Sequence, residues 1–93
     1  MFVTSGSSMA PLIETGSKLI IDWHPKIFKL GDVVLFFSHY NRLVAHRIVA
    51  VAPSGTKKHY LIKGDNTFHD DGWFEEAQLV GRVRKIIRRR KSS

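Results

Sequence analysis

Three short stretches of the chain carry side chains that together could perform nucleophilic catalysis. Residues 5–11 read Ser-Gly-Ser-Ser-Met-Ala-Pro and offer hydroxyl groups among small neighbours. Residues 43–49 place His46 in an apolar run, and residues 63–71 contain three aspartates. A serine hydroxyl becomes an effective nucleophile when a neighbouring base takes its proton and a third group orients that base. The sequence therefore supplies a nucleophile, a base and an orienting carboxylate.

Ser8 is the candidate nucleophile in the first stretch. The small residues beside it let a substrate backbone approach closely and leave backbone N–H groups available to bind an oxyanion. The alternative is an ordinary Ser/Gly-rich loop, because Gly, Pro and Ser favour turns. Residues 5–11 alone do not separate these two interpretations.

His46 is the candidate general base. Side chains alternate between the two faces of a strand, so His46 shares a face with Val44 and Ile48, whereas Ala45 and Arg47 point the other way. The alternative is a core histidine with its hydrogen bonds satisfied. An unperturbed imidazole has a pKa of about 6.5, so it is largely neutral at pH 7 and can accept a proton.

Asp65, Asp70 and Asp71 supply the candidate orienting carboxylate. Aspartates in a polar loop also serve as solvated turn residues. Their oxygens are the ligands that hard cations prefer, but the closing glutamate of an EF-hand loop is missing from its place. We therefore expect no metal site and no cofactor.

The length and composition indicate one small domain. The chain has 93 residues, no cysteine and a net charge of +7. The lack of cysteine excludes disulfides, cysteine nucleophiles and thiolate metal sites. Seven of the basic residues lie within residues 82–91, so the charge belongs mainly to one end. We expect a folded domain over residues 1–87 and a basic tail over residues 88–93.

The apolar pattern predicts an all-β fold. Helical periodicity is nearly absent, and Gly, Pro, Ser and Asn separate the apolar runs. We expect a small barrel-like domain of about six short strands. The expected strands cover residues 1–4, 18–22, 33–37, 43–51, 59–62 and 79–87. Residues 64–72 are expected to form a polar loop, and residues 73–79 a short turn.

Taken in order, the motifs of the chain resemble the type I signal peptidase family. The matching segments are Ser-Ser-Met-Ala-Pro (7–11), Gly-Asp-Val-Val (31–34), Val-Ala-His-Arg-Ile (44–48), Lys-Gly-Asp-Asn (63–66) with Asp70-Asp71, and Val-Gly-Arg-Val (80–83). The resemblance implies the β-rich fold that signal peptidases share with LexA-type repressors. His46 stands where bacterial members carry lysine, so the chain resembles the archaeal and endoplasmic-reticulum type.

The resemblance also implies roles for individual residues. Ser8 would be the nucleophile, His46 the general base and Asp71 the acid that orients the histidine. Asp65 would be the alternative for that acid, or a supporting residue paired with Arg47. Two further sets complete the expected site. The oxyanion hole would use Gly6, Ser7 and Ser8, with Gly6 at the place where some members have a serine, and substrate would contact Ser5, Met9, Leu43, Val44 and Ala45.

The expected function is that of a serine endopeptidase that cleaves a precursor or leader peptide after small residues. Substrate would add as an extended strand beside residues 43–45. Only seven residues precede Ser8, so we expect a cytoplasmic or peripheral membrane protein rather than an anchored one. The basic tail would either contact an anionic membrane or remain solvated, and the sequence does not separate these two alternatives. The expected partner is a peptide or protein precursor, and nucleic acid is not expected.

Two other functions are compatible with the sequence. A small β-barrel with a basic tail could be a non-catalytic module that binds nucleic acid or protein, and its binding would weaken with salt. However, the sequence shows no aromatic pair spaced for base stacking. A self-cleaving switch like the LexA-type repressors ranks last, because those are expected to use a lysine base and an upstream DNA-binding domain.

Overall fold

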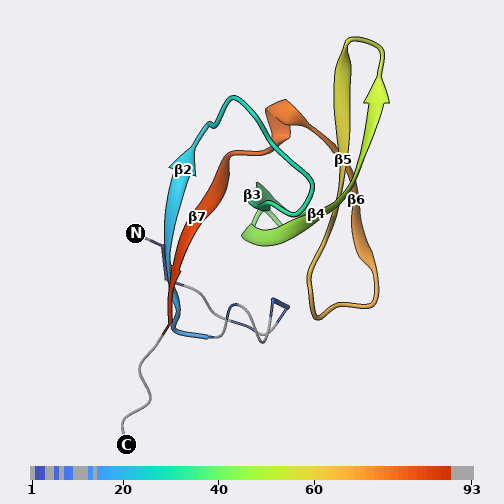
Figure 1. The fold of residues 1–93 in the computed structure, drawn as a ribbon. Helices are drawn as coiled ribbons and strands as arrows, with labels where there is room; N and C mark the ends of the chain where they lie inside the picture. Colours follow the sequence, from blue (N-terminus) through green and yellow to red (C-terminus); the bar gives the residue numbers. More distant parts are fainter. Residues whose placement is uncertain (1, 4–5, 7, 10–12, 14, 89–93) are drawn as a thin grey trace, which may run out of the picture.

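Short runs of β-branched and aromatic residues form the strands of a single antiparallel sheet. The computed structural model describes residues 2–3, 6, 8–9, 13 and 15–88. In this part of the chain, seven strands pair in the order β1-β2-β7-β3-β4-β5-β6 (Figure 1). The strands are β1 (Phe2–Val3), β2 (Lys18–Trp23), β3 (Val33–Phe37), β4 (Leu43–Ser54), β5 (Lys57–Lys63), β6 (Asp70–Glu75) and β7 (Gly81–Ile87), and a 3-10 turn, η1 (Glu76–Gln78), links the last two.

Strand β3 lies at the centre of the sheet, between β4 and β7, and is buried on both faces. Its first four residues are each at most 7% exposed. Val34 and Phe36 belong to an apolar cluster on one face, and Val33 belongs to a second cluster on the other. A strand covered on both faces has a continuous apolar sequence rather than an alternating one, which explains the run Val-Val-Leu-Phe-Phe.

The two apolar clusters divide the core between them. The larger one contains Phe28, Val34, Phe36, Ile48, Tyr60, Ile62 and Leu79. The smaller one contains Met9, Ile13, Leu19 and Val33, so it joins the segment around Ser8 to strands β2 and β3. Burial of Met9 and Ile13 therefore fixes the stretch that carries the candidate nucleophile.

Three irregularities bend the sheet. The register shifts between Ile20 and Ile21 in β2, between Ile48 and Ala50 in β4, and between Ile62 and Lys63 in β5. Bulges of this kind increase the local twist of a strand. The ring of Phe74 in β6 packs against that of Phe36 in β3, with the ring centroids 4.8 Å apart. The sheet remains open, with β1 and β6 at its edges within the described residues.

The all-β prediction is confirmed, and most predicted strands are close to the observed ones. Residues 55–56 close the β4–β5 hairpin, with Gly55 at a positive φ of 63°. The prediction of a polar loop over residues 64–72 is wrong in its last part, because Asp70–Glu75 is strand β6. Asp and Gly disfavour strands on their own, but pairing with β5 outweighs this local preference.

Shortening a core side chain should destabilise the sheet. Leu19 is 0% exposed and packs in the smaller cluster. We expect Leu19→Ala to lower the free energy of unfolding by about 2–5 kcal/mol, because a cavity replaces packed methyl groups. Urea denaturation followed by circular dichroism measures this change.

Ile27→Ala is the matched control, since Ile27 is 64% exposed. Its effect should stay within about 0.5 kcal/mol. Equal losses in the two variants would contradict the assignment of Leu19 to the core.

Candidate active site

His46 lies near the amino-terminal end of β4 and faces the larger apolar cluster. It pairs with Val34 across the β3–β4 ladder and shares the face of Val44 and Ile48, as strand alternation predicts. The residue is 7% exposed, and the edge of its ring meets Phe36 at a centroid distance of 5.9 Å. This packing restricts the imidazole to one orientation, so its two nitrogens point in fixed directions.

Both imidazole nitrogens of His46 have side-chain partners. The Nε2 atom lies 2.9 Å from the Ser8 hydroxyl oxygen, and the Nδ1 atom lies 2.6 Å from an Asp71 carboxylate oxygen. With the proton on Nδ1, the imidazole donates to Asp71 and accepts the Ser8 hydroxyl proton. The structure thus brings together the serine, histidine and aspartate that the sequence nominated, in a chain of two hydrogen bonds.

The three aspartates of the predicted acidic loop occupy different places. Asp71 reaches His46 from β6, whereas Asp70 accepts a hydrogen bond from the Gly72 backbone N–H at 2.9 Å. Asp65 bonds to Arg47. Asp71 is the residue left unpaired at the register shift of the β5–β6 ladder, between the paired residues Asp70 and Gly72, and a bulge of this kind redirects a side chain. Among them, Asp71 is the carboxylate in contact with the imidazole.

The loop between β5 and β6 holds the segment that carries Ser8. The Asn66 N–H donates to the Ser8 carbonyl at 2.7 Å, and the Asp65 N–H donates to the Met9 sulfur at 3.2 Å. Met9 itself is 3% exposed. Ser8 is therefore held by one backbone bond to the loop and by burial of the next residue. Met9, a predicted substrate contact, lies in the core beneath this segment.

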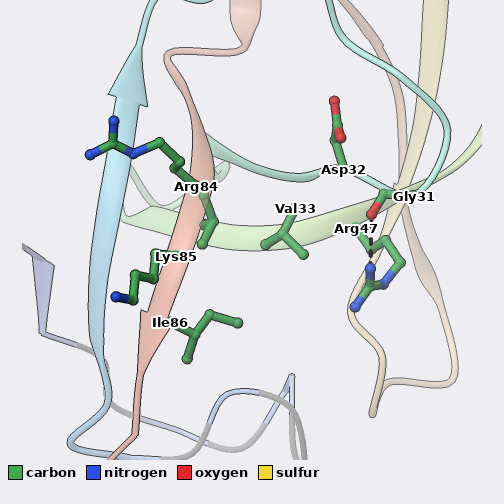
Figure 2. Close-up of a pocket in the computed structure, with 8 residues that line it drawn as sticks. Gly31, Asp32, Val33, Arg47, Arg84, Lys85 and Ile86 are labelled. Carbon is green, nitrogen blue, oxygen red and sulfur yellow. Dashed lines mark hydrogen bonds between the residues drawn. The ribbon is translucent and has the colours of Figure 1, made fainter.

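Arg47 fixes the same loop through a paired hydrogen bond. Its Nε and Nη2 atoms donate to the two oxygens of Asp65, each at 2.9 Å. Its Nη1 atom donates to the Gly31 carbonyl at 2.8 Å (Figure 2). The hydrogen bonds from Arg47 hold the pKa of the Asp65 carboxyl below its usual value, and the same bonds raise the pKa of Arg47. The predicted pairing of these two residues is present.

Arg47 also borders a cavity of about 250 Å³ on the side of β7. Figure 2 shows Val33 and Ile86 directed into this region, while the side chains of Arg84 and Lys85 point away from Arg47 toward β2. The basic groups around the cavity therefore diverge. This arrangement offers no common point at which the three cations shown would meet an anion.

The first residues of β4 present an edge that β5 does not cover. Ile48 exchanges backbone hydrogen bonds with Gly31 and Asp32, just before β3, at 2.8–2.9 Å. Backbone groups alternate in direction along a strand, so those of Leu43 and Ala45 point to the opposite side. Pairing with β5 begins only at Arg47. An extended peptide could add at residues 43–45, the predicted substrate-binding strand.

The remaining predicted site residues have mixed positions. Gly6 is exposed, and its backbone N–H donates to the Thr15 hydroxyl at 3.2 Å. Ser5 and Ser7 lie outside the described residues. In the described part of the chain, no group of three or more His, Cys, Asp or Glu side chains could hold a metal ion. Likewise, none of the helical segments described is long and apolar enough to cross a membrane.

Three residues that hold the site were not nominated from the sequence. Gly64 lies so close to Ser8 and His46 that an added Cβ would be 2.9 Å from the Ser8 carbonyl oxygen. Asn66 binds Ser8 through its backbone, and Thr15 binds Gly6. The side-chain types in a sequence do not reveal which backbone groups will be in contact. The Lys-Gly-Asp-Asn motif was the one available signal, and it pointed to the acid rather than to its neighbours.

Comparison with known proteins gives one partial similarity. The chain is 38% identical over 66 residues to signal peptidase I W of Bacillus subtilis (strain 168), and the match covers 69% of the chain. The chain spans about a third of that relative, since the match covers 34% of it. No family model matches the chain, and no solved structure matches it. The similarity supports a relationship to the signal peptidases over the matched 66 residues.

Adding a methyl group at Gly64 should displace the Ser8–His46 pair. The new Cβ would lie 2.9 Å from the Ser8 carbonyl oxygen and 3.0 Å from His46 Nε2, both too close for ordinary contact. We expect Gly64→Ala to destabilise the fold by about 1–3 kcal/mol through overpacking and to shift the NMR signals of the His46 imidazole.

Gly55→Ala serves as the control for Gly64→Ala. Its Cβ would meet no atom within 4 Å, although its φ of 63° also carries backbone strain. It should lower stability but leave the His46 signals unchanged. Unchanged signals in Gly64→Ala would contradict the close contact.

Replacing the Asp65 carboxylate should make the free energy of unfolding less sensitive to a fall in pH. Arg47 lowers the pKa of Asp65 in the folded state. The carboxylate therefore stabilises the fold fully above its pKa in the unfolded chain, which is about 4. That effect disappears as pH falls through the lower folded value. We expect Asp65→Asn to be less stable than wild type by about 1 kcal/mol at pH 7, since the pair is partly exposed. Urea denaturation at pH 7 and pH 3 measures the free energy of unfolding of both proteins. The difference between them should shrink at pH 3, and a difference that stays constant would contradict the ion pair.

Proposed function

We propose that this chain forms the catalytic domain of a serine endopeptidase that cleaves a precursor or leader peptide. The observation that carries the proposal is the hydrogen-bonded chain from Ser8 through His46 to Asp71, with distances of 2.9 and 2.6 Å. A nucleophile bonded to a base that is itself oriented by a carboxylate is the arrangement used for acyl transfer. The partial similarity to a signal peptidase supports the same reaction class.

Each member of the chain has a defined task in the proposed reaction. The Ser8 oxygen attacks the scissile carbonyl carbon while His46 Nε2 takes the hydroxyl proton. The tetrahedral intermediate then collapses, the C–N bond breaks, and the imidazolium returns the proton to the leaving amine. Water then attacks the acyl carbon while His46 Nε2 takes its proton, the ester C–O bond to Ser8 breaks, and the imidazolium returns the proton to the Ser8 oxygen. Throughout the reaction, Asp71 accepts a hydrogen bond from the Nδ1–H group of His46. This bond holds the imidazole in one tautomer and stabilises the imidazolium.

The developing oxyanion needs donors beside Ser8. The backbone N–H of Ser8 is the proposed donor, with Ser7 as a second candidate. The Gly6 N–H already donates to Thr15 at 3.2 Å, so we do not assign it to the oxyanion. This departs from the sequence-based expectation that Gly6 donates directly.

The proposed substrate is an extended peptide that pairs with the free edge of β4. The backbone groups of Leu43 and Ala45 would bind its main chain, and small side chains would be preferred before the cut, as the resemblance to signal peptidases implies. The proposed domain covers residues 1–87 and ends with β7 at Ile87. The basic segment from residue 88 onward would contact anionic lipid, and nucleic acid is not the proposed partner.

Cleavage of a diverse peptide library, read by mass spectrometry, tests the proposal. Wild type should cut after small residues and should be faster at pH 8 than at pH 6, because a general base must be neutral. Ser8→Ala and His46→Ala should each abolish cleavage. Asp71→Asn should lower the rate by at least about 100-fold, because the imidazole loses its orienting acceptor.

Asp70→Asn is the matched control for Asp71→Asn, since Asp70 bonds to the Gly72 backbone rather than to His46. It should retain cleavage close to wild type. Cleavage that survives in Ser8→Ala or His46→Ala would refute this mechanism. If wild type cut no peptide even with anionic vesicles present, the result would favour a non-catalytic binding module.

A further inference from the structure

The segment that carries Ser8 is anchored differently on its two sides. After Ser8, Met9 and Ile13 are buried, and the Ile13 N–H donates to the Met9 carbonyl at 2.9 Å. Before Ser8, the nearest described residue is Gly6, which is exposed. Burial therefore does not hold Gly6 in place, and hydrogen bonds must fix its position.

The Thr15 hydroxyl bonds to both backbone groups of Gly6. It accepts a hydrogen bond from the Gly6 N–H at 3.2 Å and donates one to the Gly6 carbonyl at 3.1 Å. A hydroxyl has one proton and two lone pairs, so both bonds can exist at once. Gly6 has a φ of 94°, a conformation that favours glycine, and the two bonds hold the peptide groups on both sides of that bend.

Thr15 stands on a rigid support. It precedes Gly16, at a φ of 88°, and Ser17, which is 1% exposed, and strand β2 begins at the next residue. Strand β2 pairs with both β1 and β7. The hydroxyl is thus fixed relative to the sheet that also carries His46.

We propose that Thr15 is a positioning residue that holds Ser8 against His46 through Gly6. The inference rests on the proposed peptidase function, in which the Ser8 oxygen must stay within hydrogen-bond distance of His46 Nε2. Gly6 lies two residues before Ser8, so loss of the Thr15 bonds would release the amino-terminal side of the nucleophile. Burial of Met9 would still hold the other side. Attack would slow because the serine would be misplaced, while substrate would still bind along β4.

The test compares Thr15→Val, which keeps the side-chain shape but loses the hydroxyl, with Thr15→Ser, which keeps the hydroxyl. Thr15→Val should lower kcat by about 10- to 100-fold with KM changed less than about threefold, because small displacements of a nucleophile have effects of this size. Thr15→Ser should restore kcat to near wild type. Thr56→Val, in the β4–β5 turn, is the control for threonine replacement and should leave kcat unchanged.

A second readout does not depend on cleavage. At pH 8, the 15N chemical shifts of the His46 imidazole should move in Thr15→Val toward those of Ser8→Ala, and should stay at wild-type values in Thr15→Ser and Thr56→Val. If wild type cleaves nothing, the proposed function fails, and these shifts alone decide whether Thr15 positions Ser8. Wild-type shifts in Thr15→Val, or a Thr15→Ser variant as impaired as Thr15→Val, would overturn the inference.

Discussion

The hydrogen bonds of the His46 imidazole constrain the arrangement of the whole site. A ring that is 7% exposed must find polar partners inside the protein, because an unsatisfied buried nitrogen destabilises the fold by about 1–3 kcal/mol. The two partners come from distant parts of the chain, 38 residues before and 25 residues after the histidine. The serine segment and strand β6 must therefore both reach β4 before the imidazole is satisfied.

The two partners are brought to His46 by different physical means. Asp71 belongs to β6 and lies at the register shift of the β5–β6 ladder, between the paired residues Asp70 and Gly72. Ser8 lies outside the strands, and its position depends on Met9 in the core, on the Asn66 N–H and on the Ser8–His46 bond itself. A sheet ladder fixes position through many cooperative bonds, whereas the serine segment relies on a few. This difference explains why the residues around the serine matter so much for its geometry.

Arg47 and Gly64 show how the acidic loop acts as a support rather than as a reagent. Arg47 neighbours the candidate base but points to the other face of β4, where it binds Asp65. Gly64 allows the loop backbone to approach Ser8 and His46 more closely than any side chain would permit. The loop therefore contributes its backbone to the site, while the carboxylate in contact with the imidazole comes from the strand that follows.

The sequence by itself determined the all-β fold and the face of β4 on which His46 lies. These follow from local patterns, because side-chain alternation and continuous apolar runs are properties of neighbouring residues. The sequence also nominated Ser8, His46 and Asp71, through the chemistry of their side chains and through motifs that occur in the same order as in the type I signal peptidases. Only the tertiary structure decided that Asp70–Glu75 is a strand, that Asp71 rather than Asp65 meets the imidazole, and that Thr15 binds Gly6. Those outcomes depend on sheet register and on backbone contacts between distant residues, which local patterns do not encode.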